Sequence, residues 1–305
     1  MKSVIMFCGK GGVGKTTCAA AAALHYASEG NKTLVISTDF TPSLRHIYEI
    51  GTSTDSADPV MVTHGLYIKE VGYAEAKHLW DSRFGTEVYE VFSAFVDISY
   101  DEFVDFITSI LPGIRDEFMV DYIRELAESG RYDKIVWDTA PAGQTLGLLR
   151  IPSLINQHLK PAPRIYSMLR TSTKGRRSVL DVIKGWEELS RRDIDFLRRD
   201  VEFNLITITE ALAVYQLDGI FQEFESYGLH VDRIIINQML IGSAPESFRT
   251  RAEMHQRYAS ELSARYTQSQ RVLPLLPYEV RGITSLREVE KALFSDESIC
   301  RQHRA

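Results

Sequence analysis

Short apolar runs, rich in β-branched residues, recur along the chain with longer helix-like stretches between them. Because few polar residues interrupt such a run, the pattern is typical of parallel strands that helices cover on both faces. The runs are residues 4–7, 34–36, 135–137, 205–208, 234–236 and 272–273. We therefore predict an α/β fold with a doubly wound, mostly parallel sheet.

Two long helical stretches, at about 73–130 and about 150–200, break this rhythm. Both contain few strand-like runs and many helix-like ones. We interpret them as two insertions that form a helical subdomain within one domain of residues 1–305. A first helix is expected between Gly14 and Gly30, because glycine suits the left-handed position at which many helices end.

Composition and charge exclude several classes of protein. The 305 residues can bury a sizeable core, and contents of 44% hydrophobic and 25% charged residues are usual for soluble globular proteins. A net charge of −6 is opposite to the basic excess of general nucleic-acid binders, so we expect no nucleic-acid partner. There is no apolar run long enough to span a bilayer and no signal peptide. Cys8, Cys18 and Cys300 are too widely spaced for a disulfide framework or a CxxC metal pair, so we expect a cytoplasmic protein.

Residues 9–16 spell G-K-G-G-V-G-K-T, which satisfies the phosphate-loop pattern G-x-x-x-x-G-K-[ST]. The segment follows an apolar strand and precedes an alanine-rich helix, which is the context that the motif requires. Backbone N–H groups and the helix N-terminus favour phosphate, Lys15 should reach the β- and γ-phosphates, and the Thr16 hydroxyl should ligate Mg²⁺. The residues predicted to bind the nucleotide here are Lys10, Gly11, Gly12, Val13, Gly14, Lys15, Thr16 and Thr17.

Lys10 is a second lysine that an ordinary phosphate loop does not need. It is either a solvated charge or a cation that reaches the phosphates of a facing subunit, as an arginine finger does. Such a cation can raise the rate by on the order of 10³–10⁵-fold. The K-G-G-V-G-K-T pattern resembles that of the deviant Walker A class of ATPases. This resemblance implies that the chain binds ATP and Mg²⁺ and forms a homodimer.

Further segments resemble one branch of that class, the arsenite-pump and tail-anchored-protein targeting ATPases. Ile36-Ser37-Thr38-Asp39 with Ser43-Leu44 is similar to the first switch of this family, and residues 138–146 are similar to its second switch. Three later segments also resemble family motifs, in the correct order along the chain: residues 210–215, 236–238 and 274–282. The resemblance covers most of the chain and implies an ATP-hydrolysing P-loop NTPase.

The resemblance also implies roles for particular residues. Asp39 corresponds to the carboxylate that orients the attacking water, and Asp138 to a Walker B-type acid in the Mg²⁺ shell. From its position alone, either acid could instead cap the helix that follows its strand. Asn237 resembles the adenine-contacting asparagine, and Glu210 a glutamate near the nucleotide. Pro277, Glu279 and Val280 are expected to border the base.

The chain departs from the family pattern in three places. Phe40-Thr41-Pro42 follows Asp39 where Pro-Ala is usual, and Gln144 stands where a histidine is common. Eukaryotic targeting factors bridge their dimer with zinc through a CxxC pair, but Pro245 and Phe248 occupy those places here. We therefore expect no zinc site, and a homodimer that rests on nucleotide and packing contacts.

The helical stretches could serve a client protein. Apolar residues at three- and four-residue steps indicate a helix face that either packs within the subdomain or lines a groove for a client's transmembrane helix. The only methionines in the two stretches, Met119 and Met168, provide little of the adaptable surface that client grooves often use. The apolar positions are Trp80, Phe84, Val88, Val91, Phe92 and Phe95, followed by Phe103, Val104, Phe106, Ile107, Ile110 and Leu111, ending at Pro112-Gly113.

Three cellular roles follow, in order of preference. The first is a carrier of tail-anchored membrane proteins. The second is the ATPase subunit of an arsenite pump, although trivalent arsenic needs soft thiolates and no cysteine lies in the helical stretches. The third is a partition or positioning ATPase. Residues 160–200 hold eleven Lys or Arg against six Asp or Glu, which indicates a solvated helix face or a contact with anionic lipid, a membrane receptor or another acidic partner.

Overall fold

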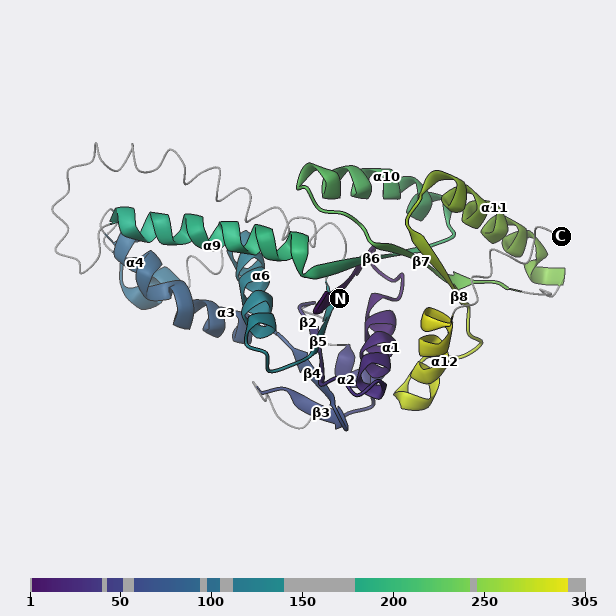
Figure 1. The fold of residues 1–305 in the computed structure, drawn as a ribbon, viewed down its shortest axis with the longest axis horizontal. Coiled ribbons are helices and arrows are strands. Elements are labelled where there is room, and N and C mark those ends of the chain that lie inside the picture. The colour runs from purple at the N-terminus through teal and green to yellow at the C-terminus, as the bar shows by residue number, and fades with distance from the viewer. Residues whose placement is uncertain are drawn as a thin grey trace.

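The core of the protein is an eight-stranded sheet in the order β3-β4-β2-β5-β1-β6-β7-β8 (Figure 1). The computed structural model describes residues 2–39, 43–51, 58–93, 98–104, 112–139, 179–241 and 246–295. Every neighbouring pair is parallel except β3 with β4. The strands are β1 Val4–Gly9, β2 Thr33–Ser37, β3 Val60–Thr63, β4 Leu66–Glu70, β5 Lys134–Asp138, β6 Val201–Ile208, β7 Arg233–Met239 and β8 Ser269–Pro274. This confirms the predicted fold class.

Alternate residues of the buried strands enter two separate hydrophobic clusters. On β1, Val4 and Met6 face one cluster, whereas Ile5 and Phe7 face the other. Because the side chains of a strand alternate between its faces, a strand buried on both sides must be apolar throughout. This double burial accounts for the uninterrupted apolar runs from which the strands were predicted.

Helices cover both faces of the sheet (Figure 1). Helices α1 (Lys15–Ser28), α2 (Leu44–Ile47) and α12 (Gly282–Phe294) supply the cluster on one face. The other face is covered by α6 (Pro112–Glu128), α9 (Val179–Arg199), α10 (Ala211–Ser226) and α11 (Arg249–Arg265). The short side chains of α1, Ala19 to Ala23, are fully buried, so this helix packs closely on the strands that carry the phosphate loop. Its bounds agree with the prediction.

The first of the two predicted helical stretches contains α3 (Tyr73–Trp80), the π-helical turn η1 (Asp81–Gly85), α4 (Thr86–Phe92) and α6. The described part of the second stretch is α9, residues 179–199, and residues 140–178 lie outside the description. Helix α6 contacts both α3 and α9. The division into a helical subdomain stays a prediction.

A buried ionic cluster joins η1, α6 and α9. Arg124, only 4% exposed, donates from Nε to Asp193 Oδ1 at 2.7 Å and also binds Asp121. Arg83 of η1 lies 2.7 Å from the second oxygen of Asp121. Burial raises the pKa of Asp193 to about 7, with a further contribution from Asp121, against the opposing effect of Arg124. The cluster therefore places several charges where solvent cannot screen them.

The structure describes only part of the apolar helix face that was predicted from Trp80 to Leu111. Trp80, Phe103 and Met119 belong to the hydrophobic core, and Phe84 packs partly buried against it. Trp80 and Phe103, which are almost completely buried, therefore hold the helices together and are not available to line a client groove. The side chains of the other stripe positions lie outside the described residues, and of the second group only Phe103 and Val104 are described: the remainder are Val88, Val91, Phe92, Phe95, Phe106, Ile107, Ile110 and Leu111. Among the described helices, none has the length and apolar character needed to cross a bilayer.

Candidate functional site

The phosphate loop joins β1 to α1 at the carboxyl edge of the sheet, in the centre of the strand order. At Gly9 a side chain would overlap the carbonyl oxygen of Ile206, so the close approach of β1 and β6 requires glycine. Gly14 has φ +94°, in the left-handed region, and directly precedes the helix. The loop therefore directs backbone N–H groups and the N-terminus of α1 to the same point, as phosphate binding requires.

Lys15 is the buried cation of this loop. Its side chain is 7% exposed, and its Nζ donates to the carbonyl oxygen of Lys10 at 3.1 Å. Burial lowers the pKa of Lys15, while the nearby Asp138 and Asp39 oppose this shift. A cation held without bulk water gains strongly from an incoming phosphate, because the anion replaces the lost solvation. Lys10, by contrast, is exposed.

Asp138 ends β5 beside the first turn of α1. It is 1% exposed, and its Oδ2 accepts a hydrogen bond from Ser37 Oγ at 3.1 Å. Burial raises its pKa to about 7, while hydrogen bonds with Thr16 and Ser37 and the charge of Lys15 oppose the shift. Its other oxygen, Oδ1, makes no hydrogen bond to any described residue.

These oxygens fit a magnesium ion. Mg²⁺ prefers oxygen ligands and usually keeps several waters, so one hydroxyl and one nearby carboxylate suffice on the protein side. The Thr16 hydroxyl and the Asp138 carboxylate are adjacent, and the unsatisfied Oδ1 of Asp138 can accept from a water in the ion's shell. The ion would neutralise charge on the phosphates.

Asp39 lies two residues beyond β2, on the same edge of the sheet. Its backbone N–H contacts Ser37 Oγ at 3.4 Å, and its side chain lines the cavity beside the phosphate loop. The structure thus brings Asp39 and Asp138 to the carboxyl ends of neighbouring strands, next to Lys15. The altered switch residues 40–42 and Gln144 lie outside the described residues.

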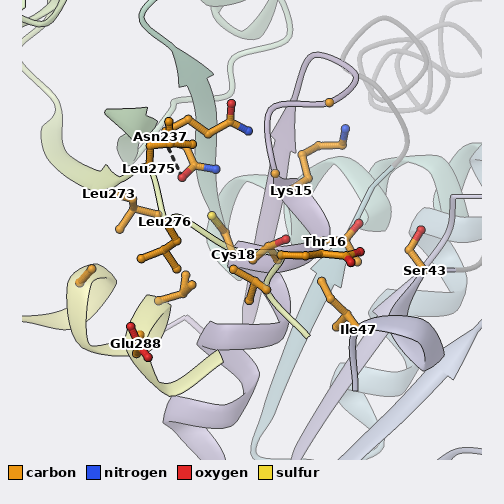
Figure 2. A pocket seen from close by; sticks show the side chains of 18 of the residues that line it. Lys15, Thr16, Cys18, Ser43, Ile47, Asn237, Leu273, Leu275, Leu276 and Glu288 are labelled. Atoms are coloured by element: carbon orange, nitrogen blue, oxygen red, sulfur yellow. Dashed lines mark hydrogen bonds between the residues drawn. The ribbon is translucent and has the colours of Figure 1, made fainter. Parts of the chain in front are cut away.

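A cavity of about 620 Å³ extends from the phosphate loop towards the C-terminal part of the chain. Figure 2 shows Lys15 and Thr16 between Ser43 and Ile47 on one side and Asn237 and Leu275 on the other. The side formed by residues 237–238 and 273–280 is called the C-terminal wall below. The volume is in the range of pockets that hold small organic ligands, which are about 300–1,000 Å³.

Asn237 connects the C-terminal wall to the phosphate loop. Its Nδ2 donates to the carbonyl oxygen of Val13 at 2.8 Å, and its Oδ1 accepts from the backbone N–H of Gln238 at 2.9 Å. The amide still has one N–H and one lone pair that are not used in these two bonds, so it can also pair with the edge of a base. Gln238 has φ +58°, a conformation that non-glycine residues seldom adopt.

Most, but not all, of the predicted site residues meet at this cavity. Glu279 and Val280 line it, together with Gly11, Gly12, Gly14, Thr16 and Thr17, whereas Pro277 is not among its lining residues. Glu210 does not line the cavity either. It stands at the N-cap of α10, where its Oε1 lies 3.4 Å from Arg251 Nη2.

Several lining residues were not predicted. His46 of α2 lies 3.7 Å from Glu279, across the cavity from the phosphate loop. The Tyr278 hydroxyl donates to Glu288 of α12 at 2.5 Å. His46 belongs to no motif, and Tyr278 lies in the family-like segment 274–282 without having been assigned a role, so only the fold reveals that both line the cavity. The other unpredicted lining residues are Cys18, Ser43, Ile47, Gln238, Leu273, Leu275, Leu276, Val289 and Ala292.

The two described cysteines are buried and unreactive in character. Cys8 is 1% exposed and Cys18 is fully buried. Burial raises the pKa of each thiol to about 12, so neither provides a thiolate at neutral pH. Cys300 lies outside the described residues.

A phosphate loop between the central strand β1 and its helix, with carboxylates at the ends of β5 and β2 on one side of β1, defines a nucleotide hydrolase of the P-loop class. Comparison with known families agrees. The model of the Anion-transporting ATPase family matches residues 2–295, so the chain belongs to this family and is an ATP-hydrolysing enzyme.

Individual relatives fall into two functional groups. The chain is 26% identical over 302 residues to the protein of Aquifex aeolicus named "Putative arsenical pump-driving ATPase 2", and the match covers 95% of this chain and 98% of the relative. It is 28% identical over 309 residues to ATPase GET3 of Kluyveromyces lactis, covering 93% and 87%. It is also 28% identical to ATPase GET3B of Arabidopsis thaliana, covering 92% and 76%.

Proposed function

We propose that the cavity holds ATP, with its phosphates on the loop of residues 9–16 and its base against the C-terminal wall. The observation that carries this placement is the continuous cavity that joins Lys15 and Thr16 to Asn237 and Val280. Lys15 binds the β- and γ-phosphates, Thr16 and Asp138 hold Mg²⁺, and Asp39 orients the attacking water.

We further propose that two copies of the chain face each other across this edge of the sheet, each supplying Lys10 to the other's phosphates. The side chain of Lys10 is exposed. Lys15 binds the backbone carbonyl oxygen of Lys10, so this hydrogen bond does not engage the Lys10 ammonium group. A loosely placed cation of this kind can reach the charge that develops on a neighbouring γ-phosphate.

Exposed apolar residues beside this edge favour packing between two copies. Leu212 and Tyr215, 60% and 61% exposed, lie on the first turns of α10, and Phe248 directly precedes α11. The ion pair between Glu210 and Arg251 joins the starts of these two helices. Exposed apolar groups rimmed by charges are typical of protein interfaces.

The dimer can be tested by measuring molecular mass by light scattering with Mg²⁺ and a non-hydrolysable ATP analogue. Phe248→Asp should weaken the dimer, whereas Met61→Asp, a control at a 60% exposed apolar residue of edge strand β3, should not. Lys10→Ala should keep nucleotide affinity and lose most turnover, by at least about tenfold. A monomeric wild type with full ATPase activity at saturating ATP would contradict the proposal.

For the cellular role, we propose a cytoplasmic carrier of tail-anchored membrane proteins rather than a subunit of an arsenite pump. Relatives with both kinds of name match over most of the chain, so similarity alone does not separate the two roles. The state of the two described cysteines favours the carrier. Trivalent arsenic binds thiolates, and the thiols of Cys8 and Cys18 are buried and protonated at neutral pH.

Co-expression with a tail-anchored protein, followed by affinity purification without detergent, tests the carrier role. A soluble complex is expected, and glutamates at Val88, Val91 and Phe92 of α4 should abolish it, whereas Met61→Glu should not. Retained ATPase activity of both variants shows that they are folded. Absence of any complex, together with ATP turnover that sodium arsenite stimulates, would replace the carrier role with the pump role.

A further inference from the structure

The end of β7, from Asn237 to Met239, and the loop that begins at Leu240 are held in place by several hydrogen bonds. Asn237 binds the phosphate loop at Val13, and Gln238 donates back to the Asn237 side chain. The carbonyl oxygen of Met239 accepts from the backbone N–H of Leu275 at 2.8 Å, which joins the two parts of the C-terminal wall. These contacts use groups that do not titrate near neutral pH. The next residue along the chain, Leu240, is held by a histidine, which does titrate in this range.

The backbone N–H of Leu240 donates to Nδ1 of His255 at 3.2 Å. His255 belongs to α11 and is only 3% exposed. A backbone N–H can only donate, so Nδ1 must be unprotonated and the neutral ring carries its proton on Nε2. Arg251 Nε lies 3.4 Å from this Nε2. Arg251 Nε is also a donor directed at the ring, but a neutral imidazole accepts at one nitrogen only, and the shorter contact assigns that acceptor to Leu240. A protonated ring would have no acceptor for either donor, so Arg251 also favours the neutral form.

The surroundings of His255 favour the neutral ring. Burial lowers its pKa, the charge of Arg251 on the same helix lowers it further, and Glu210 at the start of α10 opposes the shift. Glu210 also pairs with Arg251, which reduces its effect on the ring. Protonation would therefore begin only below the usual histidine pKa of about 6.5, and it would remove the acceptor that Leu240 uses.

We propose that His255 is a positioning residue for nucleotide binding: its neutral imidazole holds Leu240, and through it Asn237 and Gln238, in the position that accepts the nucleotide. Protonation of His255 releases this loop and weakens binding. This inference rests on the placement of the nucleotide under "Proposed function". The imidazole itself does not touch the cavity, since His255 is not one of its lining residues.

Two variants separate the effect of the hydrogen-bond acceptor of His255 from the effect of its charge when protonated. His255→Asn places an amide oxygen close to the position of Nδ1 and cannot titrate. His255→Leu keeps a similar apolar volume and removes the acceptor, so the buried N–H of Leu240 loses its partner. The affinity for Mg²⁺ with ADP is measured by calorimetry from about pH 8 to about pH 5.5.

At about pH 8, His255→Asn should bind ADP within about twofold of the wild type, and His255→Leu about tenfold more weakly, which is about 1.4 kcal/mol. In the ATPase assay, His255→Leu should raise KM and leave kcat within about twofold. Below about pH 6.5, the Kd of the wild type should rise progressively relative to that of His255→Asn, because the lowered pKa of His255 places its protonation in this range. The ratio of these two Kd values cancels the protonation of the nucleotide and of Asp138, which both proteins share.

A constant ratio across this pH range would overturn the proposal, and so would wild-type ADP affinity in His255→Leu. Thermal unfolding without nucleotide identifies a purely structural role, in which His255→Leu would be less stable and bind ADP normally. Lys15→Ala distinguishes a failure of the proposed nucleotide site from a failure of the proposed role of His255. If Lys15→Ala retains full ADP affinity, the nucleotide does not occupy this cavity and both proposals fail. If it abolishes binding and the ratio stays constant, only the role of His255 fails.

Discussion

Gly14→Ala should destabilise the protein, because the added methyl group would overlap the side chain of Asn237. In the structure, a Cβ at Gly14 would lie closer than 3.0 Å to the side-chain nitrogen of Asn237, which is itself bound to Val13. Two costs are expected for Gly14→Ala. The left-handed φ of +94° costs a non-glycine residue roughly 1–2 kcal/mol, and the displaced hydrogen bond costs about 1 kcal/mol. The free energy of unfolding should fall by about 2–3 kcal/mol.

A double-mutant cycle measured by urea unfolding isolates the contact. In the Asn237→Ala background the overlap is gone, so Gly14→Ala should cost only the conformational part, and the coupling energy should be about 1 kcal/mol. Gly12→Ala is the matched control, because Gly12 also has a positive φ, +79°, but nothing lies within 4 Å of its added Cβ. Gly12→Ala should show no coupling to Asn237. Additive effects of Gly14→Ala and Asn237→Ala, within about 0.5 kcal/mol, would refute the reasoning.

Two further predictions concern buried charges. Arg124→Met leaves Asp193 buried without its cation and Asp121 paired with Arg83 alone, so urea unfolding at about pH 8 should show a loss of about 3–5 kcal/mol. Burial already raises the pKa of Asp193 to about 7, so the folded state favours its protonated form. The loss of unfolding free energy in Arg124→Met should therefore shrink as the pH falls from about 8 to about 5. A loss that does not depend on pH would contradict this account. Asp138→Asn removes the carboxylate expected beside Mg²⁺, and ATP turnover measured against Mg²⁺ concentration should fall by about 10–100-fold, with unchanged turnover excluding that role.

The central sheet was predictable because its strands are buried on both faces, which leaves an apolar run with few interruptions. Strands β3 and β4, which form a hairpin around Gly65, were not predicted. The residues of β3 are half-buried or exposed, and in β4 the polar residues Lys69 and Glu70 follow the buried Leu66 and Ile68, so neither strand is an uninterrupted apolar run. On β4, Lys69 is buried yet charged, and an ion pair with Glu75 at 2.5 Å compensates it. A sequence pattern of burial cannot reveal a polar residue whose partner comes from another element.

The same distinction applies to the site. Residues of the phosphate loop were found because phosphate and Mg²⁺ chemistry fixes their spacing along the chain, whereas the roles of Asp39 and Asp138 were implied by the family resemblance. The C-terminal wall was found only in part, because its residues are brought together by the packing of β7, β8 and α12. His255 gave no signal in the sequence, since its role depends on one backbone N–H in a neighbouring loop.

The hydrogen bond between Asn237 and Val13 joins positions that are 224 residues apart. At a synthesis rate of about 5–20 residues per second, the first of these positions leaves the ribosome on the order of ten seconds or more before the second. During that interval the nascent chain has a complete phosphate-binding sequence but lacks Asn237, which we propose contacts the base. A polypeptide truncated before β7 is therefore expected to bind ATP more weakly than the full chain.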